Sequence, residues 1–123
     1  MLMISAIIQP SQLEQVRNEL IKMGVLGMTV SECIGHGRNG KMEHCRRAGS
    51  HAPCLICKWK VEVAIAATDR DLAIAAIVRG AKLGKIGDGK IFVSRLDEVI
   101  RIRTGERGII ASADCATPLR AAE

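Results

Sequence analysis

An apolar run of strand length, rich in isoleucine, covers residues 1–9 and stops at Pro10, which cannot continue a strand ladder. A helix is expected to follow up to Gly24, because Ser11 and Glu14 have the spacing of a capping box. Its apolar residues recur at helical spacing at Leu13, Val16, Leu20 and Met23. This part of the chain therefore predicts a strand followed by an amphipathic helix.

Two further strand patterns flank a long polar segment. Residues 25–37 begin with β-forming residues and end in glycines, which predicts a strand that runs into an exposed exit. Residues 38–56 are polar, basic and without a sustained period, which is typical of a long exposed loop. Strand character returns over residues 58–67, where alternation predicts one covered face. The residues of that face are Trp59, Val61, Val63 and Ile65.

The remaining pattern predicts a second helix and two short strands. Thr68 or Asp69 caps the helix, and a glycine-rich loop follows over residues 82–90. Residues 91–93 predict a short buried strand, and residues 99–103 predict another. The inner stripe of the helix is Leu72, Ala73, Ala76, Ile77 and Ala81.

The order of these elements is β-α-β-β-α-β with an extra C-terminal strand and a long loop between the second and third strands. This is an α+β, ferredoxin-like arrangement. A loop of that length argues against the assignment in a compact domain unless the loop is itself functional. We therefore expect the loop to carry function.

Length and composition indicate one domain with an aliphatic core. At 123 residues the chain can bury a core without disulfides, and Trp59 and Phe92 are its only aromatic residues. No apolar run approaches the roughly 20 residues that span a bilayer. No basic segment precedes an apolar stretch at the start of the chain, as it would in a signal peptide. We expect a cytoplasmic protein that does not insert into a membrane.

The charge distribution favours small anionic ligands. The net charge is +5, and the basic residues gather in two segments, residues 38–60 and 85–107. They do not form one long stripe interleaved with aromatic residues, as in proteins that bind single-stranded nucleic acids. The sequence therefore argues against a nucleic-acid partner.

Two local features suit phosphate. In residues 84–90 glycines let the backbone approach a ligand, and Lys85 and Lys90 supply charge, although the pattern lacks the ending and helix of a P-loop. In the predicted strand over residues 99–103, Arg101 and Arg103 share a face and can clamp phosphate oxygens. An ordinary turn and a charged, solvated edge strand are the alternative interpretations.

Three separated blocks of residues resemble the signature segments of the PII signalling family. They are Gly27 to Val30, Gly84 to Val93 and Val99 to Glu106, and the resemblance covers residues 1–107 in one register. It implies a PII-like domain over residues 1–107 with a signalling loop at about 37–57, and a flexible tail over residues 108–123. It also implies a homotrimer with clefts between subunits that bind ATP, ADP or AMP, and loops that dock onto a membrane transporter or a metabolic enzyme.

The resemblance assigns the nucleotide contacts position by position. One subunit contributes both the adenine and ribose pocket and the phosphate cradle, and the neighbouring subunit contributes two arginines. The residues of the first subunit are Ile7, Thr29, Gly35, Gly37, Arg38, Glu62, Val63, Ala64, Gly87, Asp88, Gly89 and Lys90. Those of the neighbour are Arg101 and Arg103.

Departures from the family pattern point to a different second ligand. Relatives that sense 2-oxoglutarate with Mg-ATP have a glutamine where this chain has Asn39, although Lys58 is present, and the chain has no tyrosine for uridylylation. Some divergent PII-like proteins are associated with inorganic-carbon uptake or carboxysomes and bind bicarbonate. We expect a second small anion such as bicarbonate near Asn39, Lys58, Arg101 and Arg103. A conventional 2-oxoglutarate-sensing nitrogen regulator is the alternative.

The cysteines support another alternative, a regulator that responds to a metal or to redox state. Cys54 and Cys57 have the CxxC spacing of zinc sites and redox pairs, and Cys45 and His51 complete a possible zinc shell. These residues fall on the long loop, where no rigid scaffold fixes catalytic geometry. We therefore expect no enzymatic activity.

Overall fold

The computed structural model describes residues 1–37 and 55–108. Its strands are β1 (Leu2–Ile8), β2 (Thr29–Gly35), β3 (Ile56–Ile65) and β4 (Gly89–Arg95). Its helices are α1 (Leu13–Lys22) and α2 (Arg70–Ala81), each preceded by a short 3-10 turn, at Pro10–Gln12 and Ala67–Asp69.

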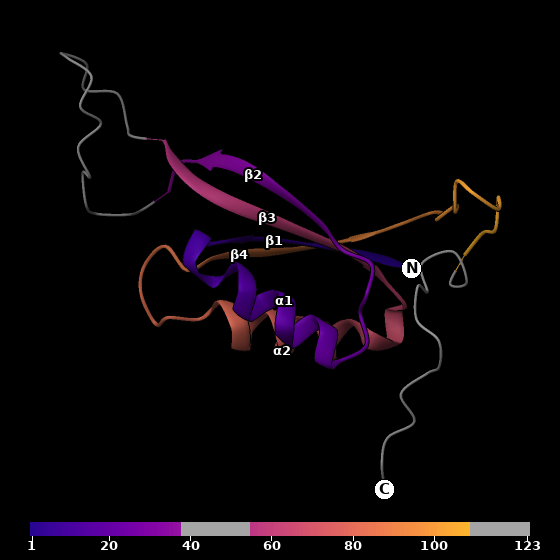
Figure 1. The fold of residues 1–123 in the computed structure, drawn as a ribbon, viewed down its shortest axis with the longest axis horizontal. Coiled ribbons are helices and arrows are strands. Elements are labelled where there is room, and N and C mark those ends of the chain that lie inside the picture. Colours follow the sequence, from indigo (N-terminus) through magenta and orange to yellow (C-terminus); the bar gives the residue numbers. More distant parts are fainter. Residues whose placement is uncertain (38–54, 109–123) are drawn as a thin grey trace, which may run out of the picture.

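The four strands form one antiparallel sheet in the order β2-β3-β1-β4. Both helices lie side by side against one face of this sheet (Figure 1). The other face, called the open face below, is not covered by any helix in the described part of the chain. This is the α+β, ferredoxin-like arrangement that the sequence predicts.

The core lies between the sheet and the helices and is entirely aliphatic. Alternation along the two central strands directs every second side chain into it. The helices contribute residues at the spacing of one helical face. The fully buried residues include Ile4, Ala6, Ile8, Val61 and Val63 of the sheet, and Val16, Leu20, Ala73, Ala76 and Ile77 of the helices.

Several local predictions were wrong. Ser11 lies inside the 3-10 turn, and Gln12 occupies the N-cap position of α1 without a side-chain cap hydrogen bond, so the capping box does not form. Leu72 is 64% exposed because the buried face of α2 is narrower than its apolar stripe. Phe92 is exposed because its side chain lies on the open face, and Val93 is exposed because β4 is an edge strand.

The extra strand over residues 99–103 is also absent from the described residues. Only one isolated bridge forms there, between Ile100 and Arg107. The Arg101 N–H donates to the Glu106 carbonyl at 2.9 Å, and the Gly105 N–H donates to the Arg101 carbonyl at 2.8 Å. This segment satisfies its backbone groups locally in a tight turn, so it does not extend the sheet.

Among the described residues, neither helix is long and apolar enough to cross a membrane. The predicted tail beyond residue 108 and most of the predicted signalling loop lie outside the described residues.

Candidate functional site

The glycine-rich loop over residues 82–88 joins the end of α2 to the start of β4. Asp88 closes this loop from within, because its Oδ2 atom accepts three backbone N–H groups. The donors are Leu83 at 3.0 Å, Gly84 at 2.9 Å and Lys85 at 3.4 Å. Successive N–H groups that converge in this way form an anion-binding nest, and here a carboxylate of the same chain fills it.

The same loop is tied to the sheet through the carbonyl of Gly87. This oxygen accepts hydrogen bonds from Gln9 Nε2 and Lys58 Nζ, each at 2.8 Å. Gln9 follows β1, and Lys58 lies near the start of β3, directly after the segment that contains the long loop. Lys58 is only 8% exposed. The loop is therefore held in place by side chains from two strands as well as by its own Asp88.

Burial and charge act in opposite directions on these two groups. Burial lowers the pKa of Lys58, and the negative charge of Asp88 partly offsets this effect. Burial would raise the pKa of Asp88, but the three N–H groups of its nest and the Lys58 ammonium outweigh burial and bring it below its ordinary value. The nest thus stabilises the ionised form of Asp88.

The open face carries several of the side chains that the resemblance assigns to nucleotide binding. The strand register aligns Lys90, Ile7 and Lys60 in one row across β4, β1 and β3. A neighbouring row contains Thr29 and Glu62. Strand alternation places these side chains, with that of Ala64, away from the helices. The candidate residues of all four strands therefore share one surface, which runs from the loop toward the other end of the sheet.

Glu62 is positioned on that surface by two contacts. Its Oε1 atom accepts a hydrogen bond from Ser5 Oγ at 3.0 Å and lies 3.3 Å from Lys60 Nζ. Val63 differs from its neighbours, because its side chain is buried in the core at 1% exposure. Only the backbone of Val63 is therefore available to a ligand on the open face.

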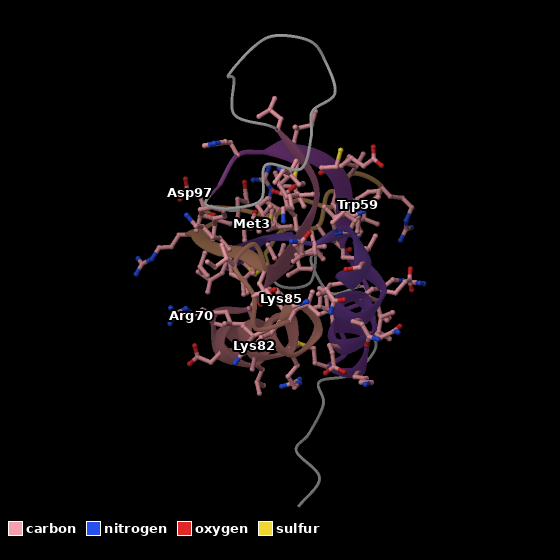
Figure 2. All side chains as sticks on the ribbon, turned by 90° about the vertical axis from the view of Figure 1, so that its left-hand side faces the viewer. Met3, Trp59, Arg70, Lys82, Lys85 and Asp97 are labelled. Carbon is pink, nitrogen blue, oxygen red and sulfur yellow. The ribbon has the colours of Figure 1, made fainter. Side chains whose placement is uncertain are left out.

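A cavity of about 300 Å³ lies between α2 and the start of β4. Its lining is mostly aliphatic, with Lys82 and Lys90 as its cations. Four of the residues assigned to nucleotide binding line it together: Ile7, Asp88, Gly89 and Lys90. Figure 2 looks at this end of the molecule and labels Lys82 and Lys85, which are both exposed. The loop end of the sheet is therefore hollowed and cationic.

The arginine pair lies at the opposite end of the sheet from the loop (Figure 1). Gly89 at the loop end of β4 pairs with Ile8, whereas Arg95 at the other end pairs with Leu2. A strand of this length spans about 20 Å, at roughly 3.3 Å per residue. Arg101 Nη1 lies 3.3 Å from Glu106 Oε2, and Arg103 is exposed. A single chain therefore does not bring its arginines to its own loop.

The remaining assignments fall near or outside the described residues. Gly35 ends β2 and Gly37 lies just beyond it, next to the start of β3. Arg38, Asn39, Cys45, His51 and Cys54 lie outside the described residues. Cys57 is exposed, and no group of three metal-ligating side chains gathers within residues 1–37 and 55–108. The zinc shell stays a prediction.

The sequence analysis did not identify the hydrogen bond from Gln9 to the glycine-rich loop. A glutamine at the end of a strand has no distinctive pattern, and its partner lies 78 positions away in the chain. The assignment of Asp88 to the nucleotide stays a prediction. The sequence analysis also did not anticipate that the Asp88 carboxylate binds the backbone of its own loop. Neither contact can be deduced from spacing.

A ferredoxin-like sheet with a cationic, glycine-rich loop at one end is a scaffold suited to binding small anions. The chain matches the family model described as nitrogen regulatory protein P-II over residues 1–106. It is 46% identical over 105 residues to nitrogen regulatory protein P-II 2 of Methanothermobacter thermautotrophicus, covering 85% of this chain and 91% of that protein. It is 43% identical over 106 residues to nitrogen regulatory protein P-II of Rhizobium etli, covering 86% and 95% respectively.

A solved structure agrees with these relatives. The structure of Arabidopsis thaliana PII bound to citrate matches with a TM-score of 0.76 and 34% identity, and the match covers 95% of this chain and 94% of that one. The chain therefore belongs to the P-II family of nitrogen regulatory proteins. Members of this family are regulatory signalling proteins rather than enzymes, and both the resemblance and the expected fold are confirmed.

Proposed function

We propose that this protein is a cytoplasmic homotrimeric regulator that binds ATP, ADP or AMP between subunits. Its loop over residues 37–57 signals to a membrane transporter or a metabolic enzyme whether nucleotide is bound. The observation that supports this proposal most is the separation of the two cationic parts of the site. The glycine loop with Lys90 lies at one end of the sheet, and Arg101 with Arg103 lies at the other.

The charge of the ligand explains why both parts are needed. ATP and ADP carry several negative charges, which are best balanced by cations from more than one direction. Because one chain separates its own cations, a second copy has to supply the arginines. The open face supports such an assembly, since Ile7 is half-buried and Phe92 is 56% exposed there without a covering helix. Neighbouring subunits would bury these apolar side chains.

Mixed oligomers test the shared site. Lys90→Ala removes the loop cation, and the double variant Arg101→Ala/Arg103→Ala removes the arginine pair. Each variant alone is expected to weaken ADP binding by about 1 to 3 kcal/mol, the size of a lost charge-assisted contact. Co-expression of both chains with different tags should restore wild-type affinity in about a third of the clefts of the mixed trimers, because each trimer that contains both chains has one cleft that pairs the intact loop with the intact arginines. Calorimetric titration of the doubly tagged oligomers measures this fraction.

Arg70→Ala is the matched control, because Arg70 is exposed and its guanidinium lies 3.6 Å from the carboxylate of Asp71, its neighbour in the chain. It should leave ADP binding unchanged. Mixed oligomers that bind no better than either variant alone would show that the site does not cross a subunit boundary. A wild-type chain that is monomeric and does not bind adenylates would overturn the proposal itself.

We further propose that a second small anion binds beside the nucleotide, with bicarbonate preferred over 2-oxoglutarate. Two features support this preference: asparagine stands at position 39 in place of the glutamine of 2-oxoglutarate-sensing relatives, and Lys58, Arg101 and Arg103 supply positive charge. Titration of bicarbonate into the ADP complex is expected to give saturable heat, and the same titration with 2-oxoglutarate in Mg-ATP is expected to give less. Heat from 2-oxoglutarate alone would instead identify a conventional nitrogen regulator.

A further inference from the structure

We propose that Asp88 is a positioning residue of the phosphate-binding loop and that its carboxylate does not contact the ligand. Its carboxylate fills the anion nest of the loop from within and so fixes the direction of the backbone that meets phosphate. This inference rests on the proposed nucleotide site and specifies how that site is built.

The contacts of Asp88 divide the loop into two parts. The N–H groups of Leu83, Gly84 and Lys85 all point at Asp88 Oδ2. These donors are therefore occupied by an internal anion, and a second anion at the same place would be repelled by it. Phosphate is left with the later part of the loop, from Gly87 to Lys90.

The second carboxylate oxygen shows that the position of Asp88 has a cost. Asp88 Oδ1 is buried and has no hydrogen-bond partner in the described part of the chain. An unsatisfied buried oxygen is unfavourable, so the contacts of Oδ2 have to offset it. The nearby Lys58 ammonium contributes by attraction. A neutral side chain of the same shape would lose this attraction and weaken the three N–H contacts.

A second anchor holds the residue just before Asp88. The Gly87 carbonyl accepts from both Gln9 and Lys58, which fixes one side of the Gly87–Asp88 peptide. Asp88 fixes the other side by binding back to residues 83–85. Between these anchors, the backbone of residues 87–89 has its direction set before any ligand arrives. Such pre-organisation strengthens binding, because less order has to be imposed when the ligand binds.

The test compares Asp88→Asn with the wild-type protein in two measurements. The first is the affinity for AMP and for ATP by calorimetry. If Asp88 positions the phosphate loop, ATP binding falls by about tenfold or more, and AMP binding falls much less because it has fewer phosphates to place. The second is amide hydrogen exchange without nucleotide, where the amides of Leu83, Gly84 and Lys85 exchange faster in the variant. Asp97→Asn, which changes an exposed carboxylate, is the matched control.

A rescue experiment separates positioning from folding. Asp88→Ala empties the nest, and added formate can occupy it as a small carboxylate, so formate should recover part of the ATP affinity of this variant. Equal loss of AMP and ATP affinity, or unchanged exchange at residues 83–85, would overturn the positioning role. A wild-type protein that binds no adenylate would instead refute the proposed function, and the exchange measurement would still decide whether Asp88 holds the loop.

Discussion

Replacing Gly89 with alanine is expected to destabilise the folded chain by about 3 to 5 kcal/mol, the range of the most disruptive single substitutions. Gly89 has a φ of +112°, which side chains rarely adopt, and an added Cβ would lie 1.7 Å from the carbonyl oxygen of Ile7. No flexible side chain can move aside, because the contact is with the backbone of the central strand β1. The midpoint of urea unfolding, measured at fixed protein concentration, should fall accordingly.

Gly84→Ala provides a control that separates the cost of the positive φ from the cost of the clash with β1. Gly84 lies in the same loop with a φ of +77°, but an added Cβ would meet nothing within 4 Å. Gly84→Ala should lower the free energy of unfolding by about 1 to 2 kcal/mol, the cost of placing a side chain on left-handed backbone. If Gly89→Ala proves no more destabilising than Gly84→Ala, Gly89 does not lie as close to the backbone of β1 as the structure shows. The junction that positions Lys90 would then need a different geometry.

The fold could be predicted from the sequence wherever one pattern determines the outcome. Strand alternation over residues 58–67 identified the buried residues Val61, Val63 and Ile65, because a sheet with one covered face requires that period. The same reasoning failed over residues 99–103. Alternation needs a neighbouring strand to become a ladder, and the Arg101 N–H instead bonds to Glu106 within a tight turn.

The sequence pointed to residues 84–90 as a candidate site, but it did not reveal the contacts that hold this loop in place. Glycines and lysines over residues 84–90 pointed to a loop that can approach an anion, although an ordinary turn fits the same pattern. The sequence contains no sign that Asp88 turns back onto residues 83–85 or that Gln9 binds the Gly87 carbonyl. Such contacts depend on how distant segments meet after folding, so only the structure shows them.

The packing of the two helices leads to the second large effect, for Gly80→Ala. Gly80 lies in the buried face of α2, and an added Cβ would come within 2.6 Å of the Val16 Cα atom and 2.7 Å of the Val16 N atom in α1. In an open helix, alanine would stabilise by about 1 kcal/mol relative to glycine. Here we expect the opposite sign, a loss of about 2 to 4 kcal/mol in the free energy of unfolding, because overpacking forces the backbones apart.

The control is the opposite substitution, alanine to glycine, on the exposed side of α2. Ala75 is exposed, so Ala75→Gly should cost about 1 kcal/mol through helix propensity alone. Gly80→Ala and Ala75→Gly would then both destabilise although they are opposite changes, which only a backbone contact at Gly80 explains. A higher urea midpoint for Gly80→Ala would mean that α1 and α2 lie farther apart. The hydrogen bond from Gln12 Nε2 to the Gly80 carbonyl, 3.0 Å here, would then also be absent.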